Sequence, residues 1–137
     1  MTKVLVVDDD VEGAETLALL LNLSGHEVHV AHDGRQALDI WHAHRHSVVF
    51  LDLEMPVLDG FDVAKSIRDI QEFDAPLVVA LTGRGREVVP LTKACGFDFH
   101  MQKPADAVSL VAAVKRVEED AAARHQSARD RTLATVS

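Results

Sequence analysis

A short apolar run that ends on a carboxylate constrains this chain more than any other stretch of its sequence. Residues 48–52 read Val-Val-Phe-Leu-Asp, which is too short for a helix and rich in residues that favour strands. The run is apolar on both sides, as in a central strand of a parallel sheet. Because an isolated buried carboxylate is strongly disfavoured, Asp52 at the end of such a strand is expected to use its charge.

Apolar runs alternate with amphipathic stretches along most of the remaining sequence. Further strands are predicted at residues 4–7, 27–31, 77–81 and 97–101. Helical patterns are centred on residues 14–21, 37–41 and 60–70, and two more helices are predicted at about 87–95 and 106–122. Strands that alternate with helices form a parallel sheet covered on both faces. The predicted fold class is therefore α/β, a doubly wound five-stranded parallel sheet flanked by five helices.

Length and composition favour one domain in a reducing compartment. The chain has 137 residues, and its apolar periodicity is lost after residue 122, so we expect a domain over 1–122 and a flexible polar tail over 123–137. The net charge of −8 argues against nucleic acid and anionic membranes as partners. A single cysteine, Cys95, excludes an internal disulfide. No apolar stretch approaches the roughly 20 residues of a membrane span, so a cytoplasmic location is expected.

Polar side chains stand at the ends of four predicted strands. They are Asp8 and Asp9, Asp52, Thr82 and Lys103. In an open doubly wound sheet, ligands bind beyond the carboxyl ends of the strands, so these side chains are expected to share one rim.

Charge accounting indicates what that rim binds. Asp8, Asp9 and Asp52 would repel one another, and Lys103 supplies only one positive charge. A divalent cation would neutralise the remainder, and carboxylate oxygens favour Mg²⁺ or a similar ion such as Mn²⁺ over zinc. Thr82 and Lys103 can donate to phosphoryl oxygens, and a carboxylate can itself attack phosphorus. The rim is thus suited to forming an aspartyl-phosphate.

Two aspartates compete for the role of nucleophile. The segment Asp8-Asp9-Asp10 contains an Asp-x-Asp that resembles the opening motif of haloacid-dehalogenase-type phosphatases, in which the first aspartate attacks phosphate. That family also needs a strand-ending acidic pair late in the chain. Only one helix and a tail are predicted after Lys103, which counts against this alternative.

The motifs around Asp52 resemble the receiver domain of two-component response regulators more closely. They are Asp8-Asp9, Asp52 with Met55-Pro56 and Asp59-Gly60, Thr82, and Lys103-Pro104, within a resemblance over about residues 3–120. It implies a flavodoxin-like fold of the receiver type. It also implies that Asp52 accepts phosphate, that Mg²⁺ is held by Asp8, Asp9, Asp52 and the Glu54 backbone carbonyl, and that Thr82 and Lys103 grip the phosphoryl group. The Lys103–Pro104 bond is expected to be cis.

The resemblance also implies partners. The phosphate donor would be a sensor histidine kinase or a histidine phosphotransfer protein. A downstream protein would bind a face formed by the fourth helix, the fifth strand and the fifth helix, and the chain would be a monomer or a phosphorylation-dependent dimer. Such a domain acts only on its own phosphate and is not classed as an enzyme. A pseudo-receiver, which keeps the fold but is never phosphorylated, is the remaining alternative, and intact Asp52, Thr82 and Lys103 argue against it.

Several positions depart from the usual receiver pattern. His100 occupies a place where Tyr or Phe is more common, so its role as a switch residue stays open. Gly83 stands where Ala is more usual and could admit the hydrolytic water, which predicts a short-lived phosphorylated state tuned also by Glu54 and Arg84. His42, His44 and His46 lie near the end of the second predicted helix, and their spacing favours a solvated helix end over a metal site.

Overall fold

The computed structural model describes most of the predicted domain. The described residues are 2–55, 60–69, 76–83, 97–103, 108–116 and 118–119. The helix predicted at 87–95, the tail over 123–137, and the individual residues Arg84, Cys95 and Pro104 all lie outside these ranges. Within the described part of the chain, no helix is long and apolar enough to cross a membrane.

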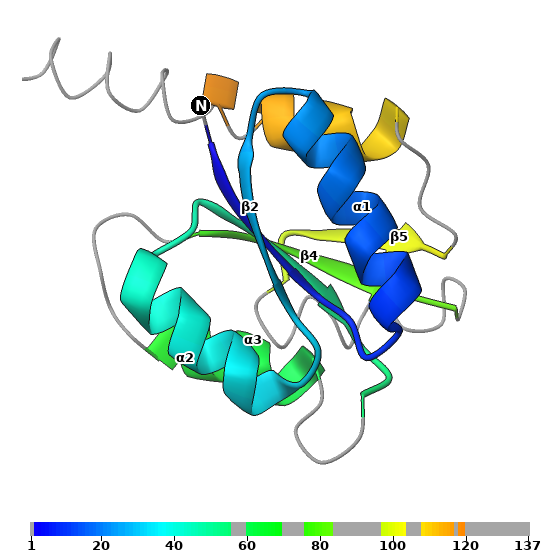
Figure 1. Ribbon diagram of the computed structural model, residues 1–137. Coiled ribbons are helices and arrows are strands. Elements are labelled where there is room, and N and C mark those ends of the chain that lie inside the picture. Colours follow the sequence, from blue (N-terminus) through cyan, green and yellow to red (C-terminus); the bar gives the residue numbers. More distant parts are fainter. Residues whose placement is uncertain are drawn as a thin grey trace, which may run out of the picture.

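Five parallel strands form one sheet in the order β2-β1-β3-β4-β5 (Figure 1). The strands are β1 (Lys3–Val7), β2 (Glu27–Ala31), β3 (Val48–Asp52), β4 (Leu77–Thr82) and β5 (Phe99–Gln102). All five residues of β3 are buried, because β1 and β4 flank it and helices cover both of its faces. The prediction that residues 48–51 form a central strand is confirmed, as is the strand predicted at residues 27–31, which lies at one edge of the sheet.

Helices cover the sheet on both sides (Figure 1). They are α1 (Val11–Leu23), α2 (Gly34–His44), α3 (Gly60–Asp69), and helical residues at 108–116 and 118–119. Asp33 caps α2 by accepting a hydrogen bond of 2.7 Å from the Gln36 amide, which satisfies one of the amides left without a partner in the first turn. The doubly wound α/β architecture predicted from the sequence is confirmed, with four of its helices in the described residues.

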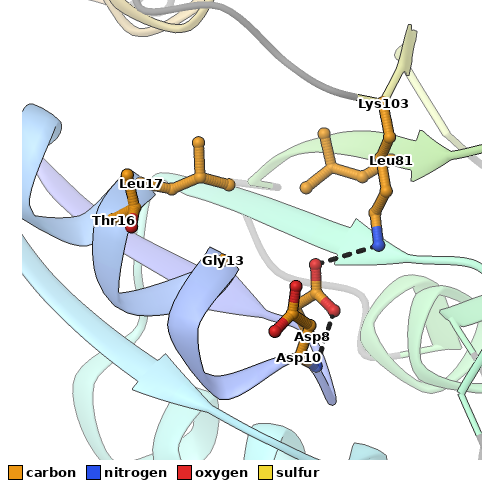
Figure 2. Close-up of a pocket in the computed structure, with 7 residues that line it drawn as sticks. All are labelled: Asp8, Asp10, Gly13, Thr16, Leu17, Leu81 and Lys103. Carbon is orange, nitrogen blue, oxygen red and sulfur yellow. Dashed lines mark hydrogen bonds and ion pairs between the residues drawn. The ribbon is translucent and has the colours of Figure 1, made fainter.

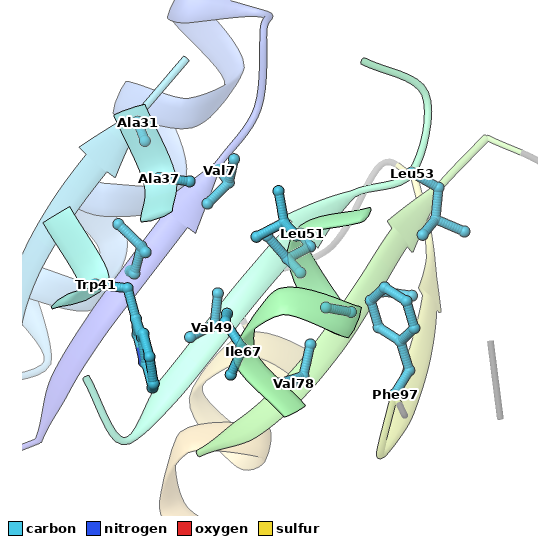
Figure 3. Close-up of a cluster of buried hydrophobic side chains, with 14 of the residues drawn as sticks. Val7, Ala31, Ala37, Trp41, Val49, Leu51, Leu53, Ile67, Val78 and Phe97 are labelled. Atoms are coloured by element: carbon cyan, nitrogen blue, oxygen red, sulfur yellow. The ribbon is translucent and has the colours of Figure 1, made fainter. Parts of the chain in front are cut away.

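Two apolar clusters hold these layers together. On one face, Trp41 of α2 and Ile67 of α3 pack on Val49 and Leu51 of β3 (Figure 3). On the other face, Leu21 of α1 and Leu110 pack with Phe50 of β3. Successive side chains of a strand point to opposite faces, so the all-apolar run before Asp52 serves both clusters. This packing fixes the strand that presents Asp52.

The fifth strand begins two residues later than the apolar pattern predicts. Phe97 is buried, but pairing with β4 begins only at Phe99, opposite Val79. Between them, the Asp98 carboxylate accepts hydrogen bonds from the Val78 amide at 2.8 Å and from Arg68 at 2.5 Å. Asp98 therefore takes a position where its side chain, as well as its backbone, contacts the start of β4.

Candidate functional site

Asp52 lies at the carboxyl end of β3 and is buried, with 2% of its surface exposed. Its Oδ1 accepts a hydrogen bond of 3.0 Å from the Glu54 amide. The next residue, Leu53, donates its amide to the Leu81 carbonyl at 2.9 Å, so β3 stays joined to β4 beyond the last residue of the strand. These contacts hold the Asp52 carboxylate in a defined orientation at the rim.

The two acidic residues after β1 meet Asp52 at this rim. Asp8 is buried, Asp9 is exposed, and one oxygen from each of the three carboxylates lies within 4.8 Å of the others. Asp8 Oδ1 accepts a hydrogen bond of 3.0 Å from the Asp10 amide, which fixes the turn from β1 into α1. The predicted acidic triad is thus assembled, because the ends of adjacent parallel strands lie side by side.

Lys103 completes the rim from the residue after β5. Its Nζ lies 3.0 Å from Asp8 Oδ2 and 3.3 Å from Asp52 Oδ2 (Figure 2 shows the contact with Asp8). Its backbone amide donates to the Thr82 carbonyl at 2.7 Å. One ammonium therefore bridges two buried carboxylates that come from different strands.

Burial and the neighbouring charges shift the pKa values of Asp52 and Lys103. Burial raises the pKa of Asp52 to about 6; Asp8 adds to this effect, whereas the Glu54 amide and Lys103 oppose it. Burial alone would lower the pKa of Lys103, but Asp8 and Asp52 outweigh it and raise that pKa. Three carboxylates and one ammonium leave an excess of two negative charges when all are ionised. This excess, presented by hard oxygen donors, suits a divalent cation.

The shifted pKa of Asp52 predicts an unusual pH dependence of stability. Between pH 4 and 6 the folded protein keeps a proton that the unfolded chain has released, so the free energy of unfolding falls as pH rises through this window. In metal-free buffer we expect Asp52→Asn to raise the free energy of unfolding at neutral pH by on the order of 2 kcal/mol. Urea unfolding of the parent and of Asp52→Asn from pH 4 to 7.5 measures the difference between their free energies of unfolding. A difference that does not shrink towards pH 4 would contradict the prediction.

An open cavity of about 460 Å³ adjoins the triad, between the first turns of α1 and the end of β4 (Figure 2). Asp8, Asp10 and Lys103 form its charged part, and Leu17 and Leu81 form its apolar part. A phosphorylated group can therefore approach Lys103 from solvent.

Thr82 has a different partner from the one that its predicted role suggests. It is fully buried at the end of β4, and its hydroxyl donates to Glu54 Oε1 at 2.6 Å. In this state the hydroxyl is engaged by a carboxylate of the loop that follows Asp52. Sequence reasoning placed both residues at the rim but did not anticipate this contact, because two residues 28 positions apart gave no pairing signal.

The structure describes two of the remaining predicted residues, His100 and Gly83. His100 is half-buried in β5, and its Nε2 is buried without a hydrogen-bond partner among the described residues. Apart from Gly83 and its chain neighbours, no described atom lies within 4 Å of the position that a Cβ would take there, so the described residues leave room for it. Arg84 and Pro104 lie outside the described residues, and the expected cis bond stays a prediction.

Comparison with known proteins agrees with this geometry. The family model of the response regulator receiver domain matches residues 4–115. The transcriptional regulatory protein CpxR of Escherichia coli is 39% identical over 118 residues, which are 85% of this chain and 49% of CpxR. The chemotaxis protein CheY4 of Vibrio cholerae superimposes with a TM-score of 0.79 at 32% identity, covering 85% of this chain and 98% of that structure. The receiver domain of the Francisella response regulator 1452 gives 0.80 at 28% identity, covering 88% and 99%.

The fold, the acidic rim and the family match together define a phosphoacceptor receiver domain. The chain belongs to the response regulator receiver domain family. It spans about half the length of the curated relatives that it matches. This membership places the chain in the receiver family and not in the haloacid-dehalogenase-type phosphatase family, whose opening motif the segment around Asp8 resembles.

Proposed function

We propose that this chain is the phosphorylation switch of a two-component or phosphorelay system and that Asp52 is its phosphoacceptor. The observation that carries the proposal is the position of Asp52: buried, 3.3 Å from Lys103 Nζ and within reach of the Asp8 and Asp9 carboxylates. The donor would be the phosphohistidine of a sensor kinase or of a phosphotransfer protein. An oxygen of Asp52 forms the new P–O bond as the P–N bond to the histidine breaks, and the imidazole leaves with the electron pair.

Asp8, Asp9 and Asp52, with the Glu54 backbone carbonyl, would hold Mg²⁺ or Mn²⁺. When bound, the cation would offset the charge of the incoming phosphoryl oxygens. Lys103 stabilises the same oxygens because its ammonium already lies between Asp8 and Asp52. The carboxylates thus bind the cation, and Lys103 binds the transferred group.

Thr82 would bind a phosphoryl oxygen only after it leaves Glu54. Its hydroxyl has one proton to donate, and Glu54 Oε1 accepts that proton at 2.6 Å in this structure. Phosphorylation would therefore exchange one acceptor for another and release the loop that carries Glu54. Through this exchange, phosphorylation of Asp52 would change the conformation of the loop that carries Glu54.

Glu54→Ala tests this exchange. We expect faster phosphorylation from a small donor, by about fivefold to tenfold. The substitution removes both the hydrogen bond from Thr82 to the Glu54 carboxylate and the repulsion between that carboxylate and the phosphate. Glu54→Gln keeps an acceptor for Thr82 but loses the charge. Its rate of phosphorylation should therefore lie between those of the parent and of Glu54→Ala. Phosphorylation rates measured by intact mass against time check this. Equal rates in all three proteins would show that Glu54 does not restrain Thr82.

Four residues would tune the response. The room that the described residues leave at Gly83 supports a role in admitting water to the phosphoryl group and hence a short-lived phosphorylated state. Glu54 and Arg84 would adjust that lifetime. His100, whose Nε2 lacks a partner among the described residues, would act as the switch residue in β5.

The proposed switch has a surface for a downstream protein and defined bounds along the chain. A downstream protein would bind the face that contains β5 and the helices predicted on either side of it, with the chain monomeric or dimerising on phosphorylation. Residues 1–122 would form the switch and 123–137 a tail. A histidine kinase as donor supports a cytoplasmic location.

Incubation with acetyl phosphate tests the proposed function. With Mg²⁺ present we expect a single phosphate adduct by intact mass, and none when the cation is chelated. A protein that stays unmodified with Mg²⁺ would instead be the pseudo-receiver, a binding module that keeps the fold without the chemistry.

A further inference from the structure

Three histidines pack together away from the acidic rim. His29 lies in β2, His44 is the last residue of α2, and His46 lies between α2 and β3. Because His46 precedes β3, the cluster lies towards the amino ends of the strands, whereas the acidic rim is at the carboxyl ends. Two segments of the chain, β2 and the end of α2 with the loop after it, are thus brought to one place.

The three rings are in contact. His29 Nδ1 and His46 Nε2 are 2.7 Å apart and share a hydrogen bond. The ring centroids of His29 and His44 are 4.2 Å apart, those of His29 and His46 4.9 Å, and those of His44 and His46 5.8 Å. The interpretation of a solvated helix end is therefore wrong for His46, which is only 2% exposed.

His46 uses only part of its hydrogen-bonding capacity. Its Nδ1 is buried and has no partner among the described residues. Burial lowers the pKa of His46 to about 4, and His29, His44 and Lys3 add to this effect. The imidazole is therefore neutral at physiological pH, and a neutral imidazole is the form that binds a metal ion.

Arg45 lies between His44 and His46 in the chain, and both of these rings pack against His29. It ends α2 in the left-handed conformation, with φ of 52°, and its guanidinium lies 4.5 Å from the centre of the Trp41 ring. This conformation is unusual for a residue other than glycine, and here the stacking on Trp41 accompanies it. The reversal of the chain at this residue brings two histidines, two positions apart, against the same strand.

We propose that His29, His44 and His46 form a binding site for a borderline divalent cation such as Zn²⁺. Nitrogen ligands favour zinc, nickel or copper over magnesium, so this site would be chemically distinct from the acidic rim. The shared proton between His29 and His46 would be replaced by the ion, which moves the two nitrogens apart to ligand distances of about 2.0–2.1 Å from the metal. The exposed His44 would turn a nitrogen inward as the third ligand, with water as the fourth.

Zn²⁺ bound here would join β2, α2 and the start of β3. Two of these elements, α2 and β3, flank the loop that contains Arg45 and His46, so the ion would fix that loop. It would also stabilise the folded state, because the unfolded chain does not bring the three histidines together.

Calorimetric titration with Zn²⁺ tests this site. The titrations use the full chain carrying Cys95→Ser, to remove the single thiol, in buffer with a large excess of Mg²⁺. We expect His44→Ala and His29→Gln each to weaken Zn²⁺ binding by about tenfold or more. His42→Ala is the matched control, since His42 is exposed on the same helix but is not among the three clustered rings, and it should bind as the parent does.

Thermal unfolding provides a second readout. Zn²⁺ should raise the midpoint of the parent and of His42→Ala, and this rise should be smaller in His44→Ala. Parent protein that binds no Zn²⁺ would overturn the proposal. Binding unchanged in both His44→Ala and His29→Gln would also overturn it, because the ion would then be at the acidic rim or elsewhere.

Discussion

Asp52→Asn is expected to abolish phosphorylation by acetyl phosphate while the protein stays folded. An amide is not a nucleophile towards phosphorus at neutral pH, whereas the Asp52 carboxylate lies at the rim with Lys103 3.3 Å away. The fold should tolerate the change because it removes a buried negative charge, one whose pKa is raised by burial and by Asp8. Intact mass after incubation with Mg²⁺ and donor measures the adduct, and circular dichroism confirms the fold.

Asp10→Asn is the matched control for this experiment. Asp10 lines the same cavity and carries the same charge, but it is exposed and is not part of the acidic triad. We expect its adduct to form as in the parent. An adduct that persists in Asp52→Asn but is lost in Asp8→Asn would instead make Asp8 the nucleophile.

The sequence was sufficient for the sheet and for the acidic rim, for a physical reason. The three central strands β1, β3 and β4 are apolar runs that stop at Asp8, Asp52 and Thr82, so the boundary of each run and its burial carry the same signal. Parallel connections then bring Asp8, Asp52, Thr82 and Lys103 to one edge without any knowledge of side-chain positions. The cation-binding and phosphate-binding chemistry of the rim could also be predicted, because it depends on which residue types end the strands.

Contacts that depend on side-chain direction could not be predicted in this way. The hydrogen bond from Thr82 to Glu54 depends on how the loop after β3 turns back, and the late start of β5 depends on the side chain of Asp98. The burial of His46 against His29 likewise arises from a left-handed residue, Arg45, which has no signature in the sequence when it is not glycine. These features lie in loops, where the apolar period gives no information.

Gly60→Ala is expected to impair both stability and phosphorylation. Gly60 is the first residue of α3 and is buried, and a Cβ there would overlap the Asp52 carbonyl oxygen and lie 3.1 Å from the Cα of Leu53. Backbone atoms at the end of a central strand cannot move as a flexible side chain can, so we expect a loss of about 1–3 kcal/mol in the free energy of unfolding. Because the shift falls on Asp52 itself, the rate of phosphorylation should drop by about tenfold to a hundredfold.

Gly83→Ala separates a local steric effect from a general effect of adding a methyl group near the site. Gly83 follows β4 at the same rim, but apart from its chain neighbours no described residue has an atom within 4 Å of its Cβ position. We therefore expect Gly83→Ala to unfold at the same urea concentration as the parent and to gain phosphate at a similar initial rate, since the role proposed for Gly83 affects only the later decay of the adduct. If Gly60→Ala also matches the parent in both measurements, then the approach of α3 to the Asp52 backbone does not fix the phosphoacceptor. Asp52 would in that case be held by its contacts with Glu54 and Lys103 and by the pairing of β3 with β4.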